Sequence, residues 1–340
     1  MTIQSRITCF GEILIRLAGR DGELLLQSPE LRTYVGGAEA NVAVALARFG
    51  VPAAMASIVP PNALGAAAVG ELRRHGVDTG PIVSLPGRIG LYFTTGAAVM
   101  RPVEVLYDRA GSAFALAEPG AIEWPRVLPG SAWLHVSGIA SALGERAAAA
   151  NQRAADAAAA LGVDVSFDGN YREQLWAASG GDAPRILRAM LATARIAFVD
   201  DRDVSLILNT RFAAEDPVER RRAAAAAAFA AFPMLERICS TVRTPRSATD
   251  HDLAGVMFTR RGELVSRTHS LAGIVDRIGA GDAFTAGILY GLASGHDEQP
   301  MLEFATAAAA LKHSLRGDAL TTGPDDVARL LSPAQLDVRR

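Results

Sequence analysis

Short apolar runs alternate with stretches of helical periodicity along most of the chain. Each run is bounded by turn-forming residues, a pattern typical of strands buried within a sheet. Between the runs, apolar residues recur at three- and four-residue spacing, which favours amphipathic helices. The predicted strands of the main pattern are 7–10, 53–59, 133–137, 163–168, 196–199, 238–242 and 255–259.

Two of the predicted helices have recognisable ends. A helix over 40–49 is followed by Gly50, the residue type that most often terminates helices. Another begins at Asp216, with Pro217 in its first position and Glu219 placed to complete a capping box. Regular alternation of strands and helices predicts an α/β fold, in which a doubly wound, mostly parallel sheet has helices on both faces.

Two segments, 12–35 and 88–109, interrupt this alternation. They contain strand-like runs at 13–17, 91–95 and 103–107 with no helix between them. We expect these segments to form a small β-sheet lid, inserted into the α/β core and covering a cleft. No repeat and no low-complexity linker marks a second independent domain.

Composition narrows the class of protein. Half of the 340 residues are hydrophobic, and 34 basic residues nearly balance 36 acidic ones, so the charge gives no reason to expect nucleic acid or an anionic membrane as partner. No uninterrupted apolar run reaches the length of a membrane span, and residues 1–6 do not resemble a signal peptide. The only cysteines, Cys9 and Cys239, are far apart, which favours a reducing compartment. We therefore expect a cytoplasmic protein.

The chain contains a single lysine, Lys312. Walker-type nucleotide-binding loops need Gly-Lys-Ser/Thr, and protein kinases need a strand lysine on the phosphates. Leu311 and His313 flank Lys312, so neither motif is present. A protein with this sequence that uses ATP must hold the phosphates by another device.

The segment 276–284 carries the sharpest chemical signal. Its Gly279-Ala280-Gly281-Asp282 turn precedes a helical run, and such a turn can direct several N–H groups at an anion. Asp282 could accept a hydroxyl proton while the amides stabilise a transferring phosphoryl group. For these residues alone, an ordinary glycine turn in which Asp282 caps the helix is an equally good interpretation. A Rossmann fingerprint is excluded, because Phe284 occupies the place of its third glycine.

The Gly-Ala-Gly-Asp turn resembles the C-terminal signature of the ribokinase-like (PfkB) carbohydrate kinases. The segment 36–41, Gly-Gly-Ala-Glu-Ala-Asn, resembles the family's N-terminal sugar-binding signature, and the likeness extends over nearly the whole chain. This resemblance implies one kinase domain over 1–340 with ATP and Mg²⁺ as cofactors. It also implies Asp282 as catalytic base, assisted by the amides of Gly279, Ala280 and Gly281.

Within the family, the chain is most similar to the 2-keto-3-deoxygluconate kinases, through 91–93, 107–113, 168–172 and 312–318. The substrate-binding residues implied by the resemblance are Gly36, Gly37, Asn41, Tyr92, Tyr107, Arg109, Arg172, Asp282 and Asp318. The implied nucleotide-binding residues are Asn170, Arg172, Arg243, Ser247, Gly279, Gly281, Lys312 and His313. Guanidinium groups bind carboxylates through paired hydrogen bonds, which suits an acid sugar. Taken singly, Arg109 is better explained as an exposed strand residue and Arg172 as a surface residue of a helix start. Only their position beside the family motifs favours a binding role.

The chain departs from the family pattern at two places. Many members have Asn-x-x-Glu after a central strand, whereas this chain has acidic residues at 200, 201 and 203. Asp203 is the candidate ligand for Mg²⁺, through water, although a turn that caps the next helix explains it as well. The usual Lys-x-Gly-x-x-Gly stretch is replaced by 241–249, in which Arg243 or Arg246 could supply phosphate charge and Ser247 a hydroxyl.

These features lead to one hypothesis and several alternatives. The hypothesis is phosphorylation of 2-keto-3-deoxygluconate at its terminal hydroxyl, giving the 6-phosphate. Kinases for the galactonate epimer, fructose or ribose are alternatives, and a non-catalytic sugar-binding regulator of the same fold is another. By analogy with the family, lid strands could pair between subunits in a homodimer.

Overall fold

The computed structural model describes residues 6–332, and within this range the strands form a large and a small sheet. The large sheet contains β1 (Arg6–Phe10), β4 (Ala53–Val59), β5 (Ile82–Ser84), β8 (Ser131–Ser137), β9 (Asp164–Asp168), β10 (Ile196–Phe198), β11 (Arg237–Pro245), β12 (His251–Thr259), β13 (Gly262–Val265) and β14 (His269–Leu271). The small sheet contains β2 (Leu14–Ala18), β3 (Arg32–Gly36), β6 (Gly90–Thr95) and β7 (Glu104–Asp108).

The large sheet is parallel through its centre and antiparallel at one edge. Its order is β13-β12-β11-β10-β9-β8-β1-β4-β5, with β14 also pairing with β12. The neighbours from β11 to β5 run parallel, whereas β12 pairs antiparallel with β11, β13 and β14. The predicted mostly parallel sheet is confirmed, and the antiparallel edge is a feature that the sequence pattern did not reveal.

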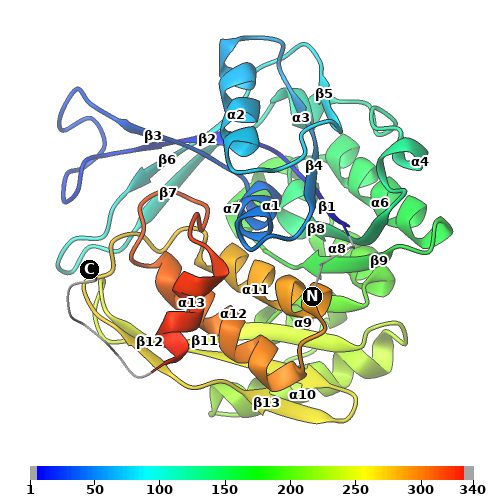
Figure 1. Ribbon diagram of the computed structural model, residues 1–340, viewed down its shortest axis with the longest axis vertical. Coiled ribbons are helices and arrows are strands. Elements are labelled where there is room, and N and C mark those ends of the chain that lie inside the picture. Colours follow the sequence, from blue (N-terminus) through cyan, green and yellow to red (C-terminus); the bar gives the residue numbers. More distant parts are fainter. Residues whose placement is uncertain (1–5, 333–340) are drawn as a thin grey trace.

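Helices cover both faces of this sheet (Figure 1). On one face α1, α11, α12 and α13 pack in succession, and on the other α6, α8, α9 and α10 do so. The helices are α1 (Ala38–Arg48), α2 (Ala63–Arg74), α3 (Ala113–Leu116), α4 (Trp124–Val127), α5 (Gly138–Ser141), α6 (Glu145–Ala160), α7 (Glu173–Ser179), α8 (Ala183–Thr193), α9 (Asp201–Leu208), α10 (Pro217–Ala231), α11 (Ala280–Ser294), α12 (Glu298–Lys312) and α13 (Pro324–Leu331). None of the helices in residues 6–332 is long and apolar enough to cross a membrane.

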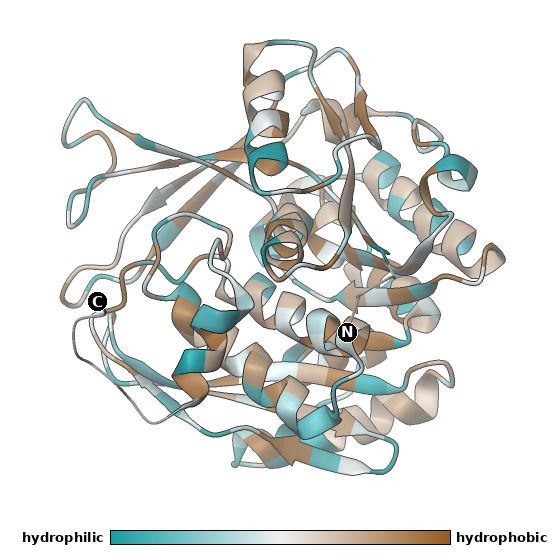
Figure 2. Ribbon diagram, in the orientation of Figure 1, coloured by the Kyte–Doolittle hydropathy of each residue, from teal (hydrophilic) through white to brown (hydrophobic). Residues whose placement is uncertain are grey.

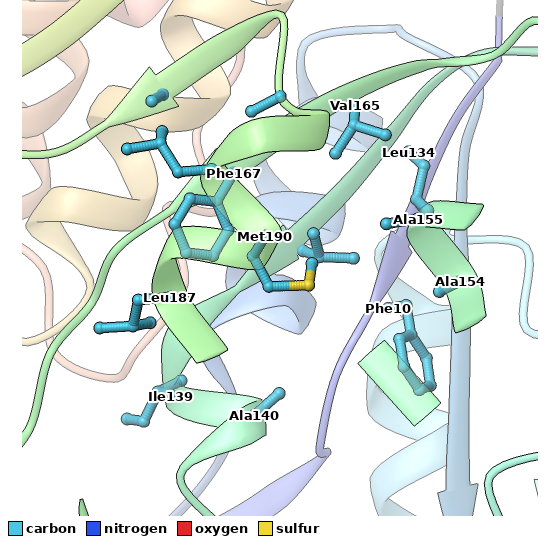
Figure 3. Close-up of a cluster of buried hydrophobic side chains, with 14 of the residues drawn as sticks. Phe10, Leu134, Ile139, Ala140, Ala154, Ala155, Val165, Phe167, Leu187 and Met190 are labelled. Atoms are coloured by element: carbon cyan, nitrogen blue, oxygen red, sulfur yellow. The ribbon is translucent and has the colours of Figure 1, made fainter. Parts of the chain in front are cut away.

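Alternation along the central strands divides the core between the two faces. Ile7 and Cys9 of β1 are buried with α1, α11 and α12, whereas Phe10 is buried with residues of α5, α6 and α8. Figure 3 shows this second cluster, in which Phe167 and Met190 also lie. Apolar residues concentrate on the strands and inward helix faces (Figure 2), so burial of both faces fixes the sheet as the rigid support of the molecule.

Several predicted ends differ from those observed. The helix of 280–294 begins directly at the Gly-Ala-Gly-Asp turn, and β12 begins at His251 rather than at 255 because it pairs along its whole length with β11. Asp216 caps α10 as predicted, accepting from the amides of Val218 and Glu219. The reciprocal capping box occurs at α9 instead.

The small sheet has the order β3-β2-β6-β7, and its strands coincide with the two interrupting segments except that β3 extends one residue further, to Gly36. It extends to one side of the α/β core in Figure 1. Tyr92 of β6 and Tyr107 of β7 line the same pocket as the strand ends of the large sheet. The small sheet therefore forms one wall of the pocket described next.

Candidate active site

A pocket of about 1300 Å³ lies between the small sheet and the carboxyl ends of the large sheet. Asp168, Phe198 and Cys239 are side by side in β9, β10 and β11 and all line it. Parallel sheets commonly bind ligands at this edge. Of the residues proposed from the sequence, those that line the pocket are Gly37, Asn41, Tyr92, Tyr107, Arg109, Asn170, Arg172, Asp203, Arg243, Ser247, Gly279, Ala280, Gly281, Asp282, His313 and Asp318.

Gly36 and Lys312 do not line this pocket. A Cβ on Gly36 would approach Asp318 Oδ2 to 2.2 Å, so Gly36 makes room for that carboxylate rather than for a ligand. Lys312 is fully buried, and its Nζ donates to the main-chain oxygens of Leu315 at 3.0 Å and Asp276 at 3.4 Å. The expected nucleotide contact by Lys312 is therefore wrong: its ammonium group ties two segments together behind the pocket wall.

The Gly-Ala-Gly-Asp turn forms the first turn of α11, and we call residues 279–282 the anion loop. Gly279 has φ of 80°, and a Cβ there would meet the main-chain oxygen of Asp318 at 1.6 Å, so only glycine fits. Within the described residues, no acceptor takes the N–H groups of Gly281 and Asp282. Free amides at a helix start attract anions.

Asp282 does not cap the helix, because Gly279 occupies that position. Its Oδ2 accepts a hydrogen bond of 2.7 Å from Nδ2 of Asn41, which lies on α1. Burial, together with the charges of Glu39 and Asp318, raises the pKa of Asp282 to about 7, although the bond from Asn41 opposes the rise. Asn41 thus orients the carboxylate of Asp282. A pKa of about 7 lets this carboxylate gain or lose a proton near neutral pH.

Two buried glutamates beneath the pocket were not identified from the sequence. Glu12 pairs with Arg109, whose Nε lies 2.6 Å from its Oε2, and both side chains are at most 4 % exposed. Glu39 accepts a hydrogen bond from the hydroxyl of Ser137, and burial raises the pKa of Glu39. Arg109 is therefore buried and is not an exposed strand residue. The carboxylate of Glu12 already balances its charge.

Arg16, also missed, joins the small sheet to Asp276, which precedes the anion loop, and to Asp318, which lines the pocket. Its guanidinium forms two hydrogen bonds to the carboxylate of Asp276, the shorter of 2.6 Å, and its Nε lies 3.1 Å from Oδ1 of Asp318. The ring of Tyr34 lies 4.4 Å from the guanidinium carbon. Tyr92 donates its hydroxyl proton to Asp318. A lone arginine in the apolar run 13–17 was the available sequence signal.

One part of the pocket carries excess positive charge. Arg172, Arg243 and Arg277 all line it, and none of them pairs with a carboxylate among residues 6–332. Burial lowers the pKa of Arg243, and the charges of Arg277, Arg202 and Arg172 lower it further. Crowded cations without counter-ions are favourable only where an anion can bind.

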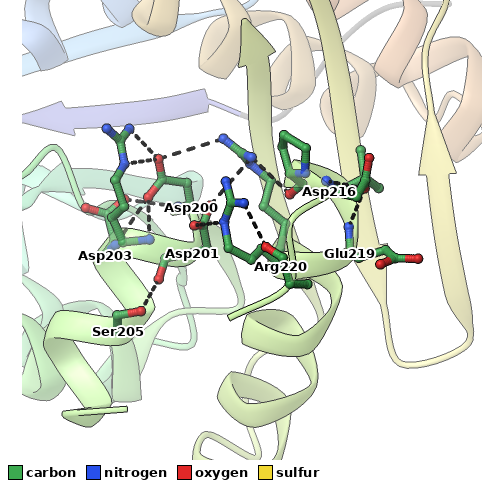
Figure 4. A network of polar contacts seen from close by, with 12 residues as sticks. Asp200, Asp201, Asp203, Ser205, Asp216, Glu219 and Arg220 are labelled. Carbon is green, nitrogen blue, oxygen red and sulfur yellow. Dashed lines mark hydrogen bonds and ion pairs between the residues drawn. The ribbon is translucent and has the colours of Figure 1, made fainter. Parts of the chain in front are cut away.

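Figure 4 shows a polar network at the start of α9, beside the pocket. Asp200 and Asp203 form the capping box, in which Oδ2 of Asp203 accepts the N–H of Asp200 at 3.0 Å. Burial and Asp200 raise the pKa of Asp203 to about 7. Arg220 and Arg221 pair with Asp201. The residues described by the structure contain no cluster of three metal-ligating side chains. The structure therefore shows Asp203 capping α9 through Oδ2, while its Oδ1 takes no part in the capping box.

Comparisons with known proteins agree with this geometry. Residues 4–235 and 254–322 match the model of the "pfkB family carbohydrate kinase". The chain is 30% identical over 345 residues to the 2-dehydro-3-deoxygalactonokinase of Haloferax volcanii, covering 99% of both chains. It is 27% identical over 289 residues to the 5-dehydro-2-deoxygluconokinase of Bacillus velezensis, covering 83% of this chain and 81% of the relative. The solved 2-dehydro-3-deoxygluconokinase of Thermotoga maritima superposes with a TM-score of 0.91 at 34% identity, covering 96% and 99%.

Replacing Arg16 tests whether its ion pairs hold the pocket together. In Arg16→Met, the buried carboxylates of Asp276 and Asp318 lose their cation, and we expect unfolding free energy to fall by about 3–5 kcal/mol. Arg20→Met is the matched control, because the pair of Arg20 with Glu30 is exposed and should contribute about 1 kcal/mol or less. Urea denaturation measures both, and equal losses would show that Arg16 has no special structural role.

Proposed function

The chain belongs to the pfkB family of carbohydrate kinases, and we propose that it transfers the γ-phosphate of ATP to the terminal hydroxyl of 2-keto-3-deoxygluconate. The products are the 6-phosphate ester and ADP. The observation that carries this proposal is the anion loop: free amides at the start of α11 lie next to the carboxylate of Asp282, in a pocket large enough for a sugar and a nucleotide.

Asp282 acts as the general base. Its carboxylate accepts the proton of the terminal hydroxyl as the hydroxyl oxygen attacks the γ-phosphorus and the bond to the ADP oxygen breaks. Asn41 holds the carboxylate by its 2.7 Å hydrogen bond, and the amides of Gly279, Ala280 and Gly281 stabilise charge on the transferred group. The proton then leaves to solvent.

Positive side chains bind the nucleotide phosphates. Arg243 lies in the segment that replaces the usual lysine-containing stretch. Burial and then the neighbouring arginines lower its pKa, and bound phosphate would offset the charge of this cluster. Asn170 and Ser247 line the same pocket and complete the proposed contacts. Asp203 is the proposed ligand of Mg²⁺, through water, and the ion when bound neutralises phosphate charge.

The carboxylate of the sugar binds Arg172. Arg109 lines the pocket too, but it already pairs with Glu12, whereas Arg172 is one of three pocket arginines without a carboxylate partner among residues 6–332. Asn41, Tyr92 and Tyr107 are the proposed contacts of the sugar hydroxyls, with Gly37 giving close approach of the backbone. Asp318 orients Tyr92.

Asp282→Asn tests the general base. We expect kcat to fall by about 10²–10⁴-fold with little change in the KM of the sugar. A general base must be ionised to accept a proton, and the pKa of Asp282 is about 7. In the unmodified enzyme, kcat/KM should therefore fall as the pH drops below 7. This acidic limb of the pH profile should be absent in Asp282→Asn. Asp156→Asn, on the exposed side of α6, is the control. Near-normal turnover by Asp282→Asn would remove Asp282 from this role.

The substrate is tested by a coupled ADP assay over sugar acids and neutral sugars. The likeness to the Thermotoga maritima 2-dehydro-3-deoxygluconokinase supports 2-keto-3-deoxygluconate, and the likeness to the Haloferax volcanii enzyme favours the galactonate epimer as second candidate. Arg172→Met should lower kcat/KM for the acid sugar by about 10–100-fold and affect fructose much less. A neutral sugar with the highest kcat/KM contradicts the acid-sugar assignment, and binding without ADP release would favour a regulator.

A cytoplasmic location is a separate proposal, supported by the two free, buried cysteines.

We also propose a homodimer that forms through the small sheet. Strands β3 and β7 are open edges, and Leu106 on β7 is 60 % exposed. Sedimentation at micromolar concentration should give the mass of two chains, and Leu106→Asp should shift it to one. A monomer in the unmodified protein contradicts this assembly.

A further inference from the structure

The single lysine of the chain lies inside the protein, behind the anion loop. Lys312 is the last residue of α12, and it is fully buried. Lysine is among the residue types least often buried completely, because removing its ammonium group from water is costly unless other partners replace the water. The groups around Nζ therefore determine what this residue can do.

Two main-chain oxygens accept hydrogen bonds from Nζ of Lys312, that of Leu315 at 3.0 Å and that of Asp276 at 3.4 Å. Asp276 lies three residues before the anion loop, and Leu315 lies in the turn that follows α12. The amide of Gly317, in the same turn, donates to the carboxylate of Asp276 at 3.2 Å. The ammonium group thus lies where the turn after α12 meets the segment that leads into the anion loop.

The charge of Lys312 opposes that of carboxylates gathered around the anion loop. Arg16 pairs with Asp276 and Asp318, and Asp282 belongs to the loop itself. Burial lowers the pKa of Lys312, whereas the charges of these carboxylates act to raise it. An ammonium group has donors only, so carbonyl acceptors and nearby carboxylates favour its charged form. Without that charge, Arg16 would be left to offset the carboxylates beside a bound phosphate.

We propose that Lys312 is a positioning residue that serves as an internal cation. Its charged ammonium group holds the segment before the anion loop in place and offsets the nearby carboxylates, so that phosphate can bind at the loop. This inference rests on the proposed function, because it assumes that phosphate occupies the anion loop. Lys312 does not line the pocket, so it acts through Asp276 and through its charge. Main-chain and carboxylate oxygens also bind free cations. An ammonium ion can therefore take the place of Nζ in a variant with a shorter side chain.

Lys312→Met keeps the length of the side chain and removes the charge. We expect kcat to fall by about 10–100-fold, because a loop that shifts slightly no longer holds the transferring phosphoryl group in line. The KM of the sugar should stay unchanged. Arg74→Met is the matched control, since Arg74 is also the last residue of its helix, α2, but is exposed and outside the pocket. Near-normal kcat in folded Lys312→Met would overturn the inference.

Lys312→Ala separates the role of the charge from that of packing, because it leaves room for an ion beside the same carbonyl oxygens. Ammonium chloride should raise the kcat of this variant about tenfold, and the bulkier tetramethylammonium chloride at equal concentration should not. The unmodified enzyme should respond equally to the two salts. ADP is measured by chromatography, so that no coupling enzyme is exposed to the salts. An equal response of Lys312→Ala to both salts would overturn the role of the charge.

A binding measurement tests the inference if no sugar is phosphorylated, an outcome in which the proposed function fails. Calorimetric titration with inorganic tripolyphosphate measures anion binding without transfer. Lys312→Met should bind this anion about tenfold more weakly than the unmodified protein, and Arg74→Met should bind it equally well. Equal affinities of Lys312→Met and the unmodified protein, or no binding by the unmodified protein, would overturn the inference. If Lys312→Ala does not fold, Lys312→Met and this titration decide.

Discussion

The anion loop depends on contacts that hold the chain directly before it, at Asp276. Before the loop, the carboxylate of Asp276 pairs with Arg16 and accepts the amides of Ile278 and Gly317. Lys312 donates to the main-chain oxygen of Asp276 from behind. Because free amides can stabilise a phosphoryl group only if they do not reorganise during transfer, this bracing matters for catalysis as well as for folding. It also links the loop to the small sheet, from which Arg16 comes.

Carboxylates and arginines without ion-pair partners line the same pocket, and burial disfavours the charged forms of both Asp168 and Arg243. Burial raises the pKa of Asp168 well above its usual value, and the neighbouring charges of Asp282 and Asp203 raise it further, while Arg243 has a lowered pKa. In the proposed reaction, a bound nucleotide neutralises the arginines, and a sugar hydroxyl donates to the carboxylate of Asp282, which Asn41 also contacts. Binding sites of this kind sacrifice stability of the free protein for function. The apolar cores on both faces of the sheet supply the folding free energy that offsets these unfavourable buried charges.

Local patterns were enough to predict most of the central strands and the turn at Gly279. They act over a few residues, through apolar alternation, helix ends and the conformational freedom of glycine. Pairs such as Arg16 with Asp276 or Arg109 with Glu12 join residues about 100 to 260 positions apart, which no local pattern reveals. The sequence thus located the pocket residues as a group. It misassigned Lys312, because a buried amine bound to carbonyls and a phosphate-binding lysine look alike in sequence.

The most direct test of this account is a crystal structure with a non-hydrolysable ATP analogue and the sugar acid bound. The account predicts terminal phosphate oxygens at about 3 Å from the amides of Gly281 and Asp282. It also predicts the acceptor hydroxyl between that phosphate and the carboxylate of Asp282. A terminal phosphate bound away from α11, with Asp282 contacting neither ligand, would contradict the central claim that this helix start performs the transfer.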